Sequence, residues 1–367
     1  MSSLNALYRL AAGLLLALAP AVSFAATDTP PASSKKTIIV IPMAYFTPET
    51  SLAGGIGGLL AGRFSGSDRT TRPSSVLFSA VYTLKNQFTI QMKPEIYLKN
   101  EAWVINGNAE WSRFPTPFFG LGNEAPEEAS ETMTPIQILT EVQVLKRIVP
   151  RWKLYAGVMG VYESYSFRAF ASGGLLASGD YRGSEGGALA GFGVTARTDS
   201  RDNVFSPRRG RFWQASAVFH GGFLGGDYRF TKIKADLRSY VPFASSAVLG
   251  FQIKLETASG DVPFMALPKL GGDSLMRGYL KGRYCDRVFA GFQAEARVPI
   301  SGRFGAAVFA GLGEVAGSPG RLSLAGLKPS LGAGLRVRIT DEGNTLRLDY
   351  GFGRRSTGFY VTVNEAF

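Results

Sequence analysis

The chain of 367 residues has one cysteine, Cys285, and one histidine, His220. A single cysteine excludes an internal disulfide, and a single histidine excludes the histidine clusters that bind metals or activate catalytic triads. We therefore expect no metal site and no cofactor. After the first 30 residues, no stretch approaches the roughly 20 apolar residues that a membrane-spanning helix needs. The most apolar segment, at 52–62, contains five glycines, which disfavour a helix.

The first residues have a different composition. One basic residue, Arg9, precedes an apolar run that ends near Val22, and small residues follow at Ser23 and Ala25. This order is typical of a secretory signal peptide, which we predict at 1–25. Residues 26–37 are rich in Pro, Ser and Lys, and they predict a short flexible tail in the periplasm. The remaining residues, 38–367, form the predicted barrel domain.

The composition favours one large barrel over two soluble domains. The chain has 45 Gly, 26 Phe and 14 Tyr, so it is rich in tight turns and aromatic side chains. Its formal charge of +12 indicates contact with anions. Since an exported chain does not meet nucleic acid, outer-membrane lipids and the phosphates of lipopolysaccharide are the expected anionic partners. The alternative is that the charge simply makes the lumen cationic.

Alternation with period two predicts strands that have one polar and one apolar face. In the segment from Tyr228 to Val241, charged residues alternate with apolar ones, and the pattern recurs along the chain. Sixteen strands are predicted, at 38–46, 52–63, 74–84, 87–98, 101–112, 133–147, 152–165, 187–199, 211–223, 227–241, 246–258, 287–300, 303–315, 328–340, 344–353 and 357–367.

The connections between these strands alternate between short and long, as in outer-membrane barrels. The long ones, at 114–132, 168–186, 259–286 and 316–327, are expected outside the cell, with both termini in the periplasm. The fold expected is all-β: a transmembrane antiparallel β-barrel of about 16 strands in the outer membrane of a Gram-negative cell.

The stretch "KLGGDSLMRGYLKGRY" at 269–284 carries two conflicting signatures. "GDSL" resembles the nucleophile block of esterases, with Ser274 as the nucleophile, whereas "MRGY" resembles a loop tip that enters a barrel. A hydrolase of that kind needs a later histidine as general base. The only histidine, His220, precedes Ser274, so we expect no enzyme and no catalytic residue.

Three stretches resemble the bacterial surface antigen barrel family, which includes BamA, TamA and two-partner secretion transporters. Arg277, Gly278 and Tyr279 match the R-G-[FY] tip of the family's long extracellular loop. The other matches are "PMAYFTPETSLAGG" at the first hairpin and "GFYVTVNEAF" at the end. The resemblance implies that the loop between strands 11 and 12 folds back into the lumen.

The last stretch also resembles the assembly signal that the outer-membrane insertion machinery reads. Four residues share its apolar parity: Phe359, Val361, Val363 and Phe367. We therefore expect that machinery to be a partner for the barrel's own insertion.

A buried guanidinium is stable only when paired, so Arg277 needs an inward-facing carboxylate. Parity gives two candidates, Glu295 and Asp349, and leaves the choice between them open. The family usually has an inward Asp on strand 13, but here Gly311 occupies that position.

Family members insert or export polypeptides, and much of their client handling lies in periplasmic POTRA domains, which we do not expect here. The first hypothesis is therefore a barrel that assists insertion or translocation of polypeptides, at the seam between strands 1 and 16 or through the lumen. Its partners would be a polypeptide client or a separate periplasmic protein. The alternative is a passive structural barrel or narrow channel without a client.

Overall fold

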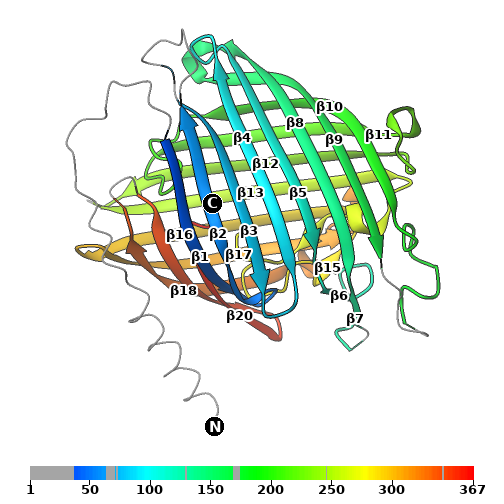
Figure 1. Cartoon of the computed structure of the whole chain (residues 1–367). Helices are drawn as coiled ribbons and strands as arrows, with labels where there is room; N and C mark the ends of the chain where they lie inside the picture. The colour runs from blue at the N-terminus through cyan, green and yellow to red at the C-terminus, as the bar shows by residue number, and fades with distance from the viewer. Residues whose placement is uncertain are drawn as a thin grey trace. The chain divides into compact units, whose positions relative to one another are not determined.

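The computed structural model describes residues 37–62, 71, 73–128, 130–167, 174–244, 246–340 and 343–367. Sixteen strands of this part form a closed antiparallel barrel, which confirms the predicted fold class (Figure 1). The predicted signal peptide at 1–25 and all but the last residue of the tail lie outside the described residues, so both stay predictions. Among the described residues, no helix is long and apolar enough to cross a membrane.

The barrel strands follow one another in chain order, and each is hydrogen-bonded to the next. They are β1 (Thr37–Thr47), β2 (Ser51–Gly62), β3 (Ser74–Thr83), β4 (Phe88–Leu98), β5 (Trp103–Arg113), β8 (Pro135–Val149), β9 (Leu154–Phe167), β10 (Gly187–Asp199), β11 (Gly210–His220), β12 (Phe230–Phe243), β13 (Ala247–Gly260), β16 (Val288–Ser301), β17 (Phe304–Ala316), β18 (Lys328–Arg338), β19 (Thr345–Gly353) and β20 (Ser356–Val363).

Two small hairpins lie in the loops, β6 (Thr116–Phe118) with β7 (Glu131–Met133) and β14 (Lys269–Leu270) with β15 (Tyr284–Cys285). Five single turns of 3₁₀-helix complete the described elements: η1 (Pro150–Trp152), η2 (Gly222–Leu224), η3 (Phe264–Ala266), η4 (Pro319–Arg321) and η5 (Leu324–Gly326). Most strand boundaries differ from the predicted ones by only a few residues. The last strand is the main exception, because β20 ends at Val363 and not at Phe367.

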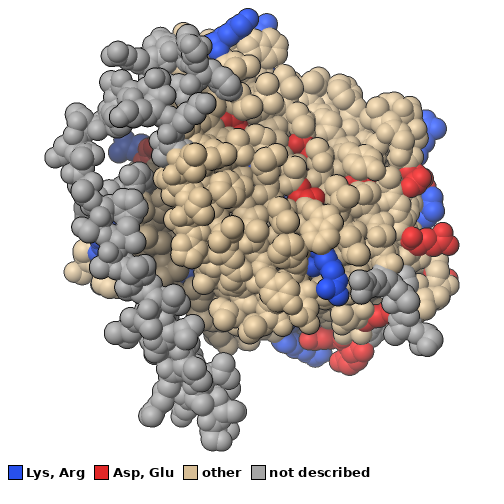
Figure 2. Space-filling model, viewed as in Figure 1, with Lys and Arg blue, Asp and Glu red and all other residues tan. Residues whose placement is uncertain are grey.

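The alternation of the sequence becomes an outward apolar face and an inward polar face. On β16, Phe292 is 42% exposed on the outside, whereas its near neighbours Gln293 and Glu295 are buried inside the lumen. Most of the wall that faces the viewer in Figure 2 is uncharged, with a few acidic and basic side chains among the tan residues. An apolar band of this kind suits contact with lipid acyl chains, and a polar interior suits water.

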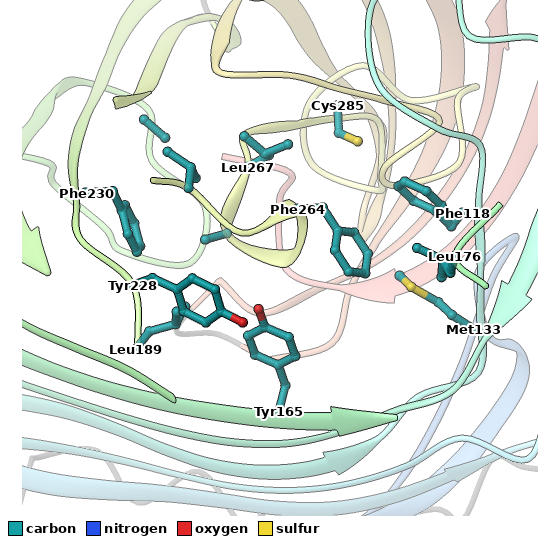
Figure 3. Close-up of a cluster of buried hydrophobic side chains, with 13 residues drawn as sticks. Phe118, Met133, Tyr165, Leu176, Leu189, Tyr228, Phe230, Phe264, Leu267 and Cys285 are labelled. Carbon is teal, nitrogen blue, oxygen red and sulfur yellow. The ribbon is translucent and has the colours of Figure 1, made fainter. Parts of the chain in front are cut away.

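The long loops gather at one end of the barrel, where they share a packed apolar core with strand ends (Figure 3). We call these residues the outer cluster: Phe118, Met133, Tyr165, Leu176, Leu189, Tyr228, Phe230, Ala258, Val262, Phe264, Ala266, Leu267 and Cys285. Four different connections contribute residues to it, those between β5 and β8, β9 and β10, β11 and β12, and β13 and β16, so they pack together at this end of the lumen.

The barrel closes between its first and last strands through very few contacts along the ladder. Neighbouring strands elsewhere in the barrel share 8 to 14 residue pairs, but β1 and β20 share a single pair, Phe46 with Val361. Ring contact between Phe46 and Phe359, at 5.9 Å between centroids, supports this junction. Among the residues that the structure describes, most of the edge of β1 that faces β20 therefore has no partner strand.

The chain turns into the lumen after β20. Asn364 has a left-handed backbone, with φ of 69°, and Ala366 and Phe367 are buried inside the barrel, as is the side chain of Glu365. Phe367 is therefore not on the outward parity that the sequence predicted for it. The physical reason is that arginines inside the barrel attract Glu365 and the backbone oxygen of Phe367.

Candidate functional site in the lumen

The loop between β13 and β16 carries the R-G-Y tip into the lumen. The β14–β15 hairpin forms its base, and the tip lies between the two short strands. Gly278 has φ of 105°, and a Cβ there would come within 2.6 Å of the backbone of Gly353. Only glycine fits this close approach, because it has no Cβ and adopts the left-handed region freely. The Gly278 N–H donates to the hydroxyl of Tyr360 at 2.9 Å.

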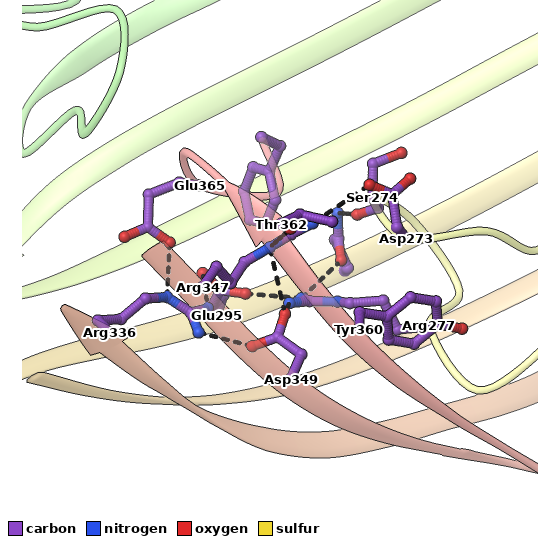
Figure 4. Close-up of polar contacts among 12 residues, drawn as sticks. Asp273, Ser274, Arg277, Glu295, Arg336, Arg347, Asp349, Tyr360, Thr362 and Glu365 are labelled. Carbon is purple, nitrogen blue, oxygen red and sulfur yellow. Dashed lines mark hydrogen bonds and ion pairs between the residues drawn. The ribbon is translucent and has the colours of Figure 1, made fainter. Parts of the chain in front are cut away.

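Arg277 lies at the centre of the tip and is fully buried. Its Nη1 lies 2.5 Å from Oδ2 of Asp349 on β19, and its Nη2 lies 2.6 Å from Oε2 of Glu295 on β16 (Figure 4). The sequence left open which carboxylate meets Arg277, and in the structure both do. The guanidinium also lies 3.4 Å above the ring of Phe309 on β17, which adds a cation–π contact.

Further arginines surround the same two carboxylates. Arg297 donates from Nε to Glu295 at 2.7 Å, and Arg336 donates from Nη1 to Asp349 at 2.6 Å. Arg336 also reaches Glu365 beyond β20, with 2.8 Å between Nε and Oε2. Each carboxylate is thus shared by at least two guanidiniums, which compensates the cost of removing these charges from water.

The loop contributes one carboxylate as well. Asp273 of the "GDSL" stretch pairs with Arg347 on β19, with 3.3 Å between Oδ2 and Nη2. Four guanidiniums therefore meet four carboxylates, and we call this set the lumen network: Asp273, Arg277, Glu295, Arg297, Arg336, Arg347, Asp349 and Glu365.

Tyr279 fixes the tip on its other side. Its hydroxyl donates to the carbonyl of Pro329 at 2.8 Å and accepts from the N–H of Arg354 at 2.6 Å. Its ring packs in a small buried cluster with Leu270 and Met276 of the same loop. Both hydrogen-bonding functions of the buried hydroxyl are satisfied, as its burial requires.

Gly311 faces the lumen, but it has no side chain and so offers no carboxylate to Arg277 at the position where the family usually has an Asp. A Cβ at Gly311 would meet Met276 Sδ at 3.6 Å and the carbonyl of Phe292 at 3.1 Å. Glu295 and Asp349 bind the guanidinium instead. This chain thus lacks the family's usual Asp at Gly311, and carboxylates on β16 and β19 bind Arg277 in its place.

Five members of the lumen network were not predicted from the sequence: Asp273, Arg297, Arg336, Arg347 and Glu365. A signal for three of them was present, because Arg297 shares its parity with Glu295, and Arg347 shares its parity with Asp349. Arg336 lies directly across the ladder from Arg347. Extending the parity argument from carboxylates to all charged residues would have found these arginines.

His220 and Ser274, the two residues considered for hydrolysis, each contact a different residue of the barrel. The ring of His220 stacks on Phe230, with 4.1 Å between centroids. Ser274 lies in the tip, where its carbonyl accepts from the side-chain amide of Gln293 at 2.7 Å. Among the described residues, no cluster of three or more His, Cys, Asp or Glu could hold a metal ion.

The residues of the predicted assembly signal separate into two groups. Phe359 and Val363 are exposed on the outer face of β20, and Val361 lies between them on the same face. Phe367 is buried in the lumen against Tyr240, with 6.1 Å between ring centroids. The outward apolar row of β20 thus ends at Val363.

Comparison with known families identifies this barrel and its inward loop. The model of the Omp85 superfamily domain matches residues 74–367, which is well over half of the chain. The chain belongs to the Omp85 superfamily. The predicted resemblance to BamA and the two-partner secretion transporters is confirmed at this level. No curated protein matches the chain in sequence.

Solved structures share the fold of this Omp85 barrel at low sequence identity. BamA from Haemophilus ducreyi, lacking POTRA domains 1–3, superposes with a TM-score of 0.62 and 12% identity over 90% of this chain and 70% of its own. CdiB from Acinetobacter baumannii superposes with a TM-score of 0.55 and 14% identity, over 89% of this chain and 59% of its own. CdiB from Escherichia coli superposes with a TM-score of 0.60 and 9% identity, over 91% of this chain and 64% of its own. The chain thus spans less than two thirds of either CdiB.

Proposed function

We propose that this Omp85 barrel assists the insertion of polypeptides into the outer membrane, or their translocation across it, at the seam between β1 and β20. The observation that carries this proposal is the single residue pair, Phe46 with Val361, that joins the two strands. Opening this junction breaks far fewer backbone hydrogen bonds than separating any other neighbouring strands. A client strand can therefore enter the barrel wall here at the lowest cost.

The free edge of β1 suits an extended client. Ile38, Ile39, Val40 and Ile41 are all exposed, so both faces of this part of the strand lack cover. An unpaired edge offers backbone donors and acceptors to an added strand, and the exposed side chains offer apolar contact. Pro42 lies within this edge and removes one donor.

The lumen offers a less favourable route. The outer cluster fills one end, and the loop tip with the lumen network occupies the region between β16 and β20. A client that passed through the lumen would have to displace buried ion pairs, each costly to break without replacement. These contacts favour the seam, and they also fit the alternative of a passive barrel without a client.

The family supports an outer-membrane location, with the long loops outside and the short turns in the periplasm. A cleaved signal peptide at 1–25 would deliver the chain. The partners we propose are outer-membrane lipids and lipopolysaccharide, the assembly machinery for the barrel's own insertion, and a polypeptide client or separate periplasmic protein. We propose transport and not catalysis, since His220 packs on Phe230 and Ser274 contacts Gln293.

Locking the seam tests the proposal. Continuing the register of the β1–β20 pair places Ala44 opposite Val363, so Ala44→Cys with Val363→Cys joins the strands when oxidised. In a strain depleted of the native protein, the oxidised variant should fail to restore the outer-membrane and secreted proteomes, and reduction should restore them. Leu60→Cys with Val76→Cys joins two strands that already pair, and it should complement in both states.

Two results would contradict the proposal. If depletion leaves both proteomes unchanged, the passive barrel is the better account. If the locked seam complements as well as the control pair, polypeptides do not use this junction.

A further inference from the structure

Charge is unevenly distributed inside the barrel. The lumen network is balanced, because its four guanidiniums meet four carboxylates. Two further carboxylates, Glu163 on β9 and Glu256 on β13, interact electrostatically with lysines on β12, β13 and the inward loop. We call these lysines the lysine cluster: Lys232, Lys234, Lys254, Lys269 and Lys281. Five ammonium groups thus face two carboxylates, so this side of the lumen carries an excess of positive charge.

Three lysines of the cluster line one cavity of about 120 Å³ between β13, β16 and the inward loop. A water molecule needs only roughly 10–15 Å³ of such space, so the cavity has room for a larger ligand. Its lining consists of Lys254, Lys269, Gly271, Gly272, Asp273, Ser274, Leu275, Lys281 and Phe289.

The lysines of this cavity have donors to spare. Among the residues that the structure describes, the ammonium groups of Lys269 and Lys281 form neither an ion pair nor a hydrogen bond. Lys254 pairs with Glu256, with 2.9 Å between Nζ and Oε1, but its side chain is still 38% exposed. Each ammonium carries three N–H donors, and most of these lack a protein acceptor here. The cavity therefore presents unused positive charge.

Glycines keep the loop side of the cavity open. Gly271 has φ of 107°, and a Cβ there would come within 2.1 Å of the carbonyl oxygen of Leu280. This close approach holds the two arms of the loop together, so Lys269 on one arm and Lys281 on the other line the same space. At Gly272 a side chain would grow toward Lys281, whose Cβ would lie 3.6 Å from the added Cβ.

We propose that Lys254, Lys269 and Lys281 form a binding site for a soluble anion that carries phosphate groups. A phosphate offers several charged acceptor oxygens, and lysine binds it as a point charge. The hydroxyl of Ser274, an exposed residue of the lining, is a further donor. The barrel wall separates the cavity from lipid, which favours a soluble ligand over a lipid headgroup.

One carboxylate of the lining opposes an anion. Asp273 borders the cavity, but it pairs with Arg347 at 3.3 Å, so its charge is shared with a guanidinium of the lumen network. The three lysines outnumber it. The site does not depend on the proposed function, because it requires neither a client nor an open seam.

Equilibrium dialysis of the full chain, folded in detergent, with radiolabelled pyrophosphate tests the site. Binding should be saturable at a single site, and it should weaken as sodium chloride is added, because salt screens the charges. Phosphatidylglycerol added to the micelles should not compete. Competition by this lipid would overturn the assignment to a soluble ligand.

Variants of the lining give changes of opposite sign. Lys269→Gln and Lys281→Gln should each weaken pyrophosphate binding about tenfold, the effect of losing one charge-assisted contact. Glu256→Gln should strengthen binding, since it removes a negative charge and releases Lys254. Heat-modifiability in gels checks that each variant is folded, and Lys281 is exposed, so its substitution leaves the packing of the loop intact.

Lys93→Gln is the matched control. Lys93 shares its parity on β4 with Glu95, which meets Arg197 of β10 across the lumen, so Lys93 is a lumenal lysine outside the cavity. Its substitution should leave the affinity unchanged. Equal weakening by Lys93→Gln and Lys269→Gln, or binding that does not saturate, would overturn the site and indicate a diffuse cationic lumen. Unchanged affinity in both Lys269→Gln and Lys281→Gln would overturn it as well. The complementation assay measures the seam separately.

Discussion

Arg277 and Asp349 are 72 residues apart in the sequence, and their side chains meet at 2.5 Å inside the barrel. The contact joins an inserted loop to β19, while Glu295 joins the same guanidinium to β16. The tip is thus fixed to two separate strands of the wall.

Arg277→Ala should leave a folded, heat-modifiable barrel but impair transport. Removing one partner of a buried pair costs roughly 3–5 kcal/mol, and the low end applies because Glu295 retains Arg297 and Asp349 retains Arg336. Heat-modifiability in gels and complementation measure the two effects. Arg277→Lys keeps the charge but loses the two-pronged contact, so it should be intermediate. Absence of a folded barrel in Arg277→Ala would instead show that the tip is needed for assembly.

Double-mutant cycles should find that Arg277 is coupled to both carboxylates. We expect interaction free energies of about 1–3 kcal/mol with Glu295→Gln and with Asp349→Asn, since each makes a direct contact. Urea unfolding of the single and double variants in detergent gives these values. Coupling to only one carboxylate would contradict the shared arrangement.

Deleting Phe367 should reduce insertion into the membrane if the end of the chain serves as an assembly signal. Its place in the lumen gives a second reason for a defect, because the ring packs against Tyr240. Tyr240→Ala separates the two: it removes the packing partner and leaves the signal unchanged. We expect lower surface levels for the deletion, and normal levels with reduced thermal stability for Tyr240→Ala. Unchanged surface levels in the deletion would count against the signal.

Cys285 should resist thiol reagents in the folded protein. Burial raises the pKa of this thiol to about 11, so the reactive thiolate is scarce at pH 8. The unfolded thiol ionises near its ordinary value, so folding stability should fall as the pH rises from about 9 to 11, by about 3 kcal/mol at most. Alkylation rates and urea unfolding between pH 8 and 11 test this, and Cys285→Ala should remove that part of the pH dependence. Rapid labelling at pH 8 without denaturant would contradict it.

The strands were predictable because a barrel wall separates two solvents, and each residue's parity records which one it faces. This argument located Glu295 and Asp349 as candidates before any contact was known. It failed at Phe367, where it assumed that the alternation continued to the end of the chain. Glu365 argued against this assumption, because its carboxylate would face lipid if the alternation continued past Val363.

The seam was less predictable for a different reason. The first and last strands are separated by nearly the whole chain, and no local pattern states how many of their residues pair. Hairpin strands are set in register by their turn, but β1 and β20 have no connection that does this. The single pair of Phe46 with Val361 is a property of the closed barrel alone.

The attachment of Arg277 to β16 and β19 also has a mechanical consequence. Two strands, β17 and β18, lie between these attachment points, so the loop tip spans an arc of the wall and sets its curvature. Any flattening or widening of the barrel's cross-section must stretch buried ion pairs if it involves this arc. Deformation is therefore directed to the remaining circumference, which includes the junction between β1 and β20.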